Sequence, residues 1–222
     1  MISLIREHLS KLAHPIIIFF AKMKIHPTVF TIIGLLLAIA TGIFLGLNNF
    51  LAAFILIWLA GTMDFIDGGV ARYLKLESIK GSFLDSVVDR LSDIAVFAGI
   101  IWSEPVDGVT GIIMVGSALM ISYVRAKGES IGVQRMAVGL MERGERWIGL
   151  MILMFISLLW PNQGFITPIY YPPFLAGIDG FDGISYFSIG YIILTGLCVI
   201  TVIQRFIYVA IQLTKSEAVP EA

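Results

Sequence analysis

The stretch MDFIDGGVARYLKLESIKGSFLDSVVDR, residues 63–90, places four aspartates in an otherwise apolar chain. Asp64 and Asp67 are three residues apart, and Asp85 and Asp89 are four apart, so on helices each pair projects from one face. Four neighbouring carboxylates without cations would repel one another and be driven to bind protons. Carboxylate oxygens are also the ligands that Mg²⁺, Mn²⁺ and Ca²⁺ prefer. The stretch therefore predicts a site for divalent metal.

The composition around this stretch is that of a membrane protein. Of 222 residues, 58% are hydrophobic and 14% are charged, whereas a soluble domain is nearer half apolar and a quarter charged. A spanning helix needs roughly 20 apolar residues. Six segments meet that length, at about 27–47, 50–73, 82–103, 108–127, 138–160 and 186–212. We expect an all-α integral membrane protein with six transmembrane helices.

The first residues of the chain have a different pattern. Leu4, Ile5, Leu9 and Leu12 recur at helical spacing with charged residues opposite them, which is typical of an amphipathic helix at the membrane interface. The segment also lacks the small-residue cleavage site of a signal peptide. We expect three parts, which are a juxtamembrane amphipathic helix over 1–24, a six-span domain over 25–214 and a tail over 215–222.

Basic residues are distributed unevenly among the predicted loops. They precede the first span, lie between spans two and three and between four and five, and follow the last span. The loops around Asn48, at 104–107 and at 161–183 contain no Lys or Arg. By the positive-inside rule, both termini and the four aspartates face the cytoplasm, and we expect a multi-pass protein of the cell membrane.

The histidines and the cysteine lie away from the aspartates. The single Cys198 is in an apolar run, and the three histidines precede the first span. A zinc or iron–sulfur site is therefore not expected.

Small residues accompany the aspartates. Gly68, Gly69 and Gly81 lack side chains, so a phosphate-bearing ligand can approach the backbone there. Arg72 follows Gly69 within one helical turn, and its guanidinium can donate two hydrogen bonds to phosphate oxygens. Helix packing is the alternative explanation for Gly69, because small residues in spanning helices commonly serve that purpose.

At these positions the chain resembles a known family. Asp64-x2-Asp67-Gly68-x2-Ala71-Arg72-x8-Gly81-x3-Asp85-x3-Asp89 is similar to the signature of the CDP-alcohol phosphatidyltransferases. The resemblance implies a six-span membrane enzyme, often a homodimer, that displaces CMP from a CDP-linked alcohol with Mg²⁺ or Mn²⁺, with two ions expected. It implies no nucleic-acid partner.

The resemblance also implies roles for individual residues. Asp64, Asp67, Asp85 and Asp89 would ligate metal, and Asp89 would also be the catalytic base for the acceptor hydroxyl. The CDP-lipid would contact Gly68, Ala71, Arg72, Ser78 and Gly81.

The segment Pro27-Thr28-Val29-Phe30-Thr31 resembles the family's Pro-Asn-x-x-Thr segment, which approaches the lipid donor. Thr28 and Thr31 are therefore further expected CDP-lipid contacts. Thr28 replaces the usual Asn. Its hydroxyl could reach a phosphate or could cap the helix, and both interpretations stay open.

Basic residues outside the signature indicate which kind of acceptor the protein binds. Residues 122–147 carry five of them, and Arg205 lies within the last predicted span, where an unpaired cation is costly. Several cations from different spans can hold one phosphate, so a phosphorylated acceptor is expected. Glu142 and Glu145 are the alternative, as internal partners.

Within this family, the chain is similar to the phosphatidylinositol phosphate synthases and the archaetidylinositol phosphate synthases in four further sequence segments. The similar segments are Leu84-Asp85-Ser86-x-x-Asp89-Arg90-x-Ser92-Asp93, Ser122-Tyr123-x-Arg125-Ala126-Lys127-x-Glu129, Glu142-Arg143-x-Glu145-Arg146 and Gln204-Arg205. With that resemblance, the expected acceptor-binding residues are Arg125, Lys127, Arg143, Arg146 and Arg205.

The leading hypothesis is transfer of the lipid phosphoryl group of CDP-diacylglycerol or CDP-archaeol to 1L-myo-inositol 1-phosphate, with release of CMP. One alternative keeps this chemistry with glycerol 3-phosphate, serine or a phosphopolyol as acceptor. A carboxylate-lined divalent-cation transporter is the other alternative. It is disfavoured because all four acids lie at one membrane end, whereas transport sites usually lie at the midplane.

Overall fold

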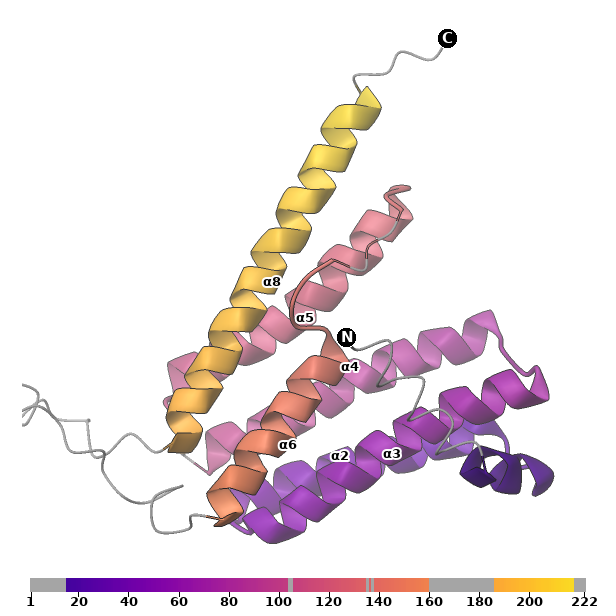
Figure 1. Ribbon diagram of the computed structural model, residues 1–222, viewed down its shortest axis with the longest axis vertical. Coiled ribbons are helices and arrows are strands. Elements are labelled where there is room, and N and C mark those ends of the chain that lie inside the picture. The colour runs from indigo at the N-terminus through magenta and orange to yellow at the C-terminus, as the bar shows by residue number, and fades with distance from the viewer. Residues whose placement is uncertain (1–14, 104–105, 135, 137, 160–185, 218–222) are drawn as a thin grey trace, which may run out of the picture. The chain divides into compact units, whose positions relative to one another are not determined.

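In the computed structural model, the described residues are 15–103, 106–134, 136, 138–159 and 186–217, and every regular element among them is helical. Besides a short helical segment at residues 15–22, the elements are α2 (Pro27–Gly46), α3 (Phe50–Leu74), α4 (Ile79–Trp102), α5 (Gly108–Ser130), α6 (Arg143–Leu159) and α8 (Tyr186–Glu217), drawn in Figure 1. The predicted all-helical class is confirmed for these residues. Most of the predicted amphipathic helix and the whole loop at 161–183 lie outside them.

Four of these helices, α2, α3, α5 and α8, are long and apolar enough to cross a membrane. The predicted spans at 82–103 and 138–160 correspond to α4 and α6, which are not in this group. α4 carries the charged residues of the signature, and α6 has only 17 residues with Arg143, Glu145 and Arg146 in its first turn. Six spans thus remain a prediction.

The predicted start of the fifth span, at residue 138, is wrong. α6 begins at Arg143, and residues 138–142, which we call the connector, precede it as an irregular segment. Gly139 has a φ of +125°, which a helix does not allow and which side chains rarely adopt. A Cβ atom there would also overlap the Thr201 side chain of α8. The connector is therefore packed closely against α8.

The chain forms two compact units, Met1–Val96 and Phe97–Ala222, and α4 passes from one to the other. In the first unit, α2 and α3 form an antiparallel hairpin (Figure 1). Asn48 turns the chain with a φ of +57°, and the Asn49 side chain caps α3 by accepting from the backbone N–H of Ala52 at 3.2 Å. The tight turn sets α2 beside α3 along their length.

The ends of the hairpin helices bring α4 back beside α3. α3 ends where Lys75 adopts the left-handed conformation and its N–H bonds to the carbonyl of Ala71. α4 begins after Ser78, whose hydroxyl accepts from the N–H of Gly81 at 3.1 Å. Only the residues between Leu74 and Ile79 separate the two helices. The short connection returns the signature's second acid pair to the end of α3 that carries the first.

In the second unit, α5 and α6 both pack on α8. Glycines allow the closest approaches, because a Cβ atom at Gly190 would overlap the Leu153 side chain of α6. Aromatic rings fill the interior, with Phe187 stacked on Tyr191 at 6.0 Å between centroids and Phe97 edge-on to the same ring at 6.4 Å. These contacts order α6 and α8, and with them the basic residues that the helices carry.

We predict that Gly42→Ala destabilises the first unit and Gly34→Ala does not. A Cβ atom at Gly42 would overlap the backbone carbonyl of Ala95, whereas one at Gly34 would lie in ordinary contact, 3.5 Å from Cβ of Met63. Overpacking of this kind costs about 1–3 kcal/mol. Thermal unfolding in detergent should show a clear decrease in Tm for Gly42→Ala only. An equal decrease in both variants would contradict the proposed close approach of α2 and α4.

Candidate metal centre and basic cluster

Three of the four predicted metal ligands converge between α3 and α4. Asp64 on α3 and Asp85 and Asp89 on α4 each offer a carboxylate oxygen, and these oxygens all lie within 4.8 Å of one another. We call these three residues the acidic cluster. Asp64 is exposed and Asp89 is half-buried, so the cluster is accessible from outside. An oxygen-only set of this size fits Mg²⁺ or Mn²⁺, which take carboxylates together with water.

The fourth acid, Asp67, lies beside this group. It is 7% exposed, and its Oδ2 accepts a hydrogen bond from Thr31 Oγ1 at 2.6 Å. The charges of Asp64 and Asp85 act on it as well, so all four acids share one region of the first unit. The bond from Thr31 orients the Asp67 carboxylate. Sequence reasoning missed this contact, because the two residues are 36 positions apart and only packing of α2 on α3 brings them together.

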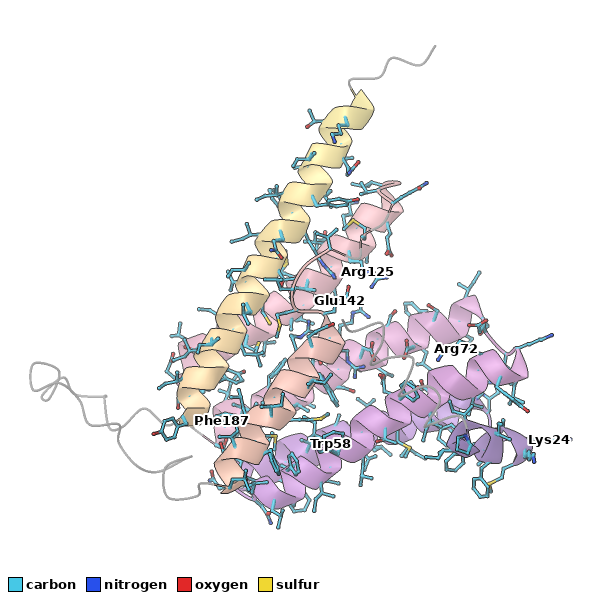
Figure 2. All side chains as sticks on the ribbon, viewed as in Figure 1. Lys24, Trp58, Arg72, Arg125, Glu142 and Phe187 are labelled. Atoms are coloured by element: carbon cyan, nitrogen blue, oxygen red, sulfur yellow. The ribbon has the colours of Figure 1, made fainter. Side chains whose placement is uncertain are left out.

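The residues expected to contact CDP lie on or next to α3 and α4, the two helices that carry the acids. The guanidinium of Arg72 lies over Gly68, where a Cβ atom would be 3.3 Å from an Arg72 amino nitrogen. Arg72 itself is exposed near the end of α3, as Figure 2 shows. Ser78 precedes α4 and Gly81 lies in its first turn, and the N-terminal backbone N–H groups of a helix suit an anion. Ala71 is half-buried on α3.

Contacts in the first unit bear on two interpretations that the sequence left open. The N-cap of α2 is His26, whose ring nitrogen accepts from the N–H of Thr28, so Thr28 does not cap the helix. A Cβ atom at Gly69 would lie 2.5 Å from Cδ1 of Ile17. Gly69 therefore serves packing of residues 15–22 on α3, and its alternative role beside a ligand is not supported.

In the second unit, the predicted acceptor residue Arg205 bonds to three residues in other segments of the chain. It is 2% exposed, with Nε donating to the Val138 carbonyl at 2.7 Å and one amino group donating to the Ile121 carbonyl at 2.8 Å. Its other amino group pairs with Glu142 Oε1 at 3.0 Å. The internal partner that the sequence left open is therefore present, and it is Glu142.

The other predicted acceptor residues differ in exposure. Arg146 is 1% exposed and donates to the Met141 carbonyl at 3.4 Å, while Arg143 lies 4.7 Å from the centroid of the Trp147 ring. Arg125 and Lys127 are exposed on α5. Arg125 pairs with Glu129 at 3.0 Å. The charges of Arg125 and Arg146 both act on Arg205, so cations from α5, α6 and α8 form a basic cluster in this unit.

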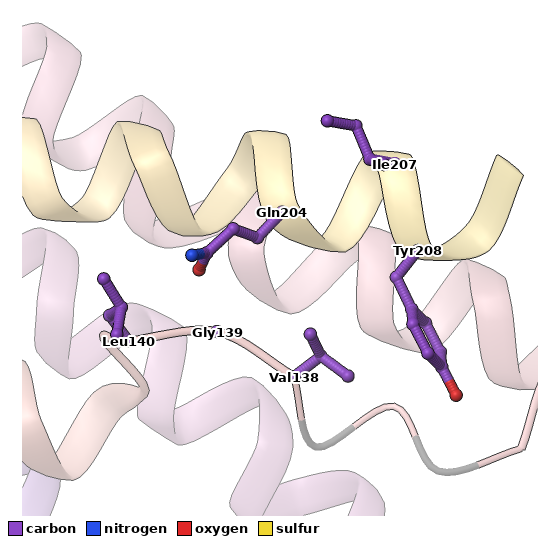
Figure 3. Close-up of a pocket in the computed structure, with 6 residues that line it drawn as sticks. All are labelled: Val138, Gly139, Leu140, Gln204, Ile207 and Tyr208. Carbon is purple, nitrogen blue, oxygen red and sulfur yellow. The ribbon is translucent and has the colours of Figure 1, made fainter. Parts of the chain in front are cut away.

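An open pocket of about 390 Å³ adjoins this cluster (Figure 3). The connector contributes Val138, Gly139 and Leu140, and α8 contributes Gln204, Ile207 and Tyr208. Its lining is mainly apolar, and it is bounded by the residue before Arg205. The structure thus places a cavity between the connector and α8, and the sequence had no signal for it.

We predict that Thr31→Val weakens metal binding about tenfold, because outer hydrogen-bond partners of metal ligands typically contribute 10–100-fold to affinity. Thr41→Val is the matched control, since Thr41 is also buried on α2 but donates to the Leu37 carbonyl of its own helix. Calorimetric titration with Mn²⁺ measures both variants. Thr31→Ser should keep the wild-type affinity. Equal affinities for Thr31→Val and Thr41→Val would show that the hydroxyl does not orient Asp67.

Comparisons with known proteins agree with the resemblance seen in the signature. Residues 24–203 match the CDP-alcohol phosphatidyltransferase family. The chain is 34% identical over 179 residues to the archaetidylinositol phosphate synthase of Methanothermobacter thermautotrophicus, a match that covers 81% of this chain and 80% of the relative.

Two solved structures of the phosphatidylinositol phosphate synthase of Mycobacterium tuberculosis have a similar fold. The form with CDP-DAG bound aligns with a TM-score of 0.69 and 26% identity, covering 90% of this chain and 94% of that one. The form with manganese and citrate aligns with a TM-score of 0.68 and 27% identity, covering 88% and 87%. Together with the signature and the apolar helices, these matches show that the chain belongs to the CDP-alcohol phosphatidyltransferase family, multi-pass membrane enzymes of phospholipid synthesis.

Proposed function

We propose that this enzyme transfers the lipid-bearing phosphoryl group of a CDP-lipid to 1L-myo-inositol 1-phosphate and releases CMP. The observation that carries the proposal is the convergence of Asp64, Asp85 and Asp89 within 4.8 Å in a member of this family. The cations of α5, α6 and α8 favour a phosphorylated acceptor, and the named relatives are inositol phosphate lipid synthases.

The donor would lie along the first turns of α4 and the end of α3. Arg72 can neutralise diphosphate oxygens, and the bare backbone at Gly68 and Gly81 permits close approach. Ala71 and Ser78 border the same surface, and Thr28 and Thr31 extend the contact to α2. The M. tuberculosis relative was crystallised with CDP-DAG, whereas the M. thermautotrophicus relative is named for an archaeol lipid, so both donors are candidates.

The four aspartates would hold two Mg²⁺ or Mn²⁺ ions. When bound, such ions neutralise charge on the diphosphate as the phosphoryl group is transferred. The chain's own contribution is the placement of Asp89 beside the other carboxylates, where it accepts the proton of the attacking 3-hydroxyl. The hydroxyl oxygen bonds to the lipid-bearing phosphorus, the bond from that phosphorus to CMP breaks, and CMP leaves with the electron pair.

The acceptor phosphate would be bound by Arg125, Lys127, Arg143, Arg146 and Arg205. A guanidinium group can donate two hydrogen bonds to one phosphate, and these five cations come from three helices. The exposed members, Arg125 and Lys127, meet the acceptor first, and the buried members Arg146 and Arg205 set the shape of the cluster.

The proposed architecture is a six-span domain over 25–214, preceded by the juxtamembrane helix over 1–24 and followed by the tail over 215–222. α4 and α6 would complete the six spans, with their charged ends in the cytoplasm. We also propose a homodimer in the plasma membrane, with both termini and the acidic cluster on the cytoplasmic side. The uneven distribution of Lys and Arg supports this orientation.

The function is tested by CMP release from CDP-diacylglycerol and CDP-archaeol with a panel of acceptors. We expect turnover with inositol 1-phosphate, little with glycerol 3-phosphate or serine, and complete loss with EDTA. Asp89→Asn should reduce the rate more than about a hundredfold, which is the scale of a general base. Asp107→Asn is the control, because Asn can still cap α5. Preferred use of glycerol 3-phosphate, or full activity of Asp89→Asn, would refute the proposal.

The orientation is tested with single cysteines and a membrane-impermeant maleimide. Cys198 is buried, so the native chain should give little labelling. Glu77→Cys, between α3 and α4, should be labelled only in inverted vesicles, whereas Leu47→Cys at the opposite end of the hairpin should be labelled in intact cells. Labelling of both positions from one side would contradict a spanning hairpin.

A further inference from the structure

Glu142 is the last residue of the connector, directly before α6, and it is also the ion-pair partner of Arg205. Its backbone carbonyl accepts from the N–H of Arg146 at 3.1 Å, the bond that opens the helix. Its carboxylate accepts from the Arg205 amino group at 3.0 Å. The two buried arginines of the basic cluster, on α6 and α8, are thus joined through one residue.

Further bonds attach the connector to the same place. Arg205 Nε donates to the Val138 carbonyl, and the Met141 N–H donates to Thr201 Oγ1 at 3.1 Å, one turn earlier on α8. Figure 3 shows the connector running along α8 at this point. Because Arg205 also bonds the Ile121 carbonyl of α5, the guanidinium links α5, the connector and α8.

Glu142 is the acidic partner of the buried Arg205 guanidinium, at 3.0 Å, in a cluster that also contains the like-charged Arg125 and Arg146. A buried charge left without its partner is strongly unfavourable, so loss of the carboxylate should displace Arg205 or the connector. The Glu142 side chain is 36% exposed while that of Arg205 is 2% exposed, so the carboxylate lies at the accessible edge of the pair.

We infer that Glu142 is a positioning residue for the acceptor, acting through its ion pair with Arg205 and its bond to the first turn of α6. This inference rests on the proposed function of the basic cluster in binding an acceptor phosphate. Glu142 holds the connector against α8 and sets the direction of the Arg205 side chain. It does not itself take part in the chemistry at Asp89.

The test compares Glu142→Gln with Glu145→Gln, which makes the same charge change one turn later on α6. We expect Glu142→Gln to raise the acceptor KM roughly tenfold, the scale of one charge-assisted hydrogen bond, with little change in the CDP-lipid KM. Glu145→Gln should leave both KM values near wild type. Glu142→Asp, which keeps the charge, should recover part of the lost acceptor affinity.

A double-mutant cycle with Arg205→Lys identifies the route of the effect. If Glu142 acts through Arg205, adding Glu142→Gln to Arg205→Lys should change the acceptor KM far less than adding it to wild type. Three results would overturn the inference, namely an equal rise in Glu145→Gln, a parallel rise in the CDP-lipid KM, or a lower acceptor KM in Glu142→Gln. The last would mean that Glu142 competes with the acceptor phosphate for Arg205.

The two proposals fail in different ways. The cycle uses whichever phosphorylated acceptor the wild-type enzyme turns over fastest. A preference for glycerol 3-phosphate would therefore refute the proposed function while the role of Glu142 is still measured. If Arg205→Lys does not fold, the comparison of Glu142→Gln, Glu142→Asp and Glu145→Gln decides the inference by itself.

Discussion

Carboxylates that meet within a few ångströms repel one another unless cations or protons lie among them. Asp64, Asp85 and Asp89 meet in this way between α3 and α4, with Asp67 beside them. The helix caps at Lys75 and Ser78 and the packing of α2 help to order these two helices.

The hairpin partner α2 has two functions in this arrangement. Its close contact at Gly42 brings the backbone of α4 near, and its Thr31 hydroxyl donates to the buried Asp67 carboxylate. The same helix thus supplies packing where the chain is apolar and a hydrogen bond where it is acidic. Gly69 extends the packing to the segment at residues 15–22 on another face of α3.

In the second unit, basic rather than acidic side chains form a cluster. Two of them, Arg146 and Arg205, are almost completely buried. Backbone carbonyls of α5 and of the connector, together with the Glu142 carboxylate, satisfy the Arg205 guanidinium. Because these hydrogen bonds join the guanidinium to α5 and to the connector, they also hold those segments in place beside α8. This explains why the connector is irregular where an apolar pattern predicted helix.

Much of the fold and the nature of the metal site could be predicted from local patterns. The hairpin helices were predicted to within a residue, because apolar length and turn residues are local properties. The spacing of the aspartates likewise placed each pair on one helix face. Residue 138 was a wrong helix start because hydropathy does not report a positive φ at Gly139. The partners of Arg205 lie 63 to 84 positions away along the chain, and that of Thr31 lies 36 away. Such contacts depend on which helix faces meet. The spacing of residues in the sequence was therefore sufficient to indicate the chemistry of the aspartates. Only the packing of the helices decided which side chains orient the aspartates and the arginines.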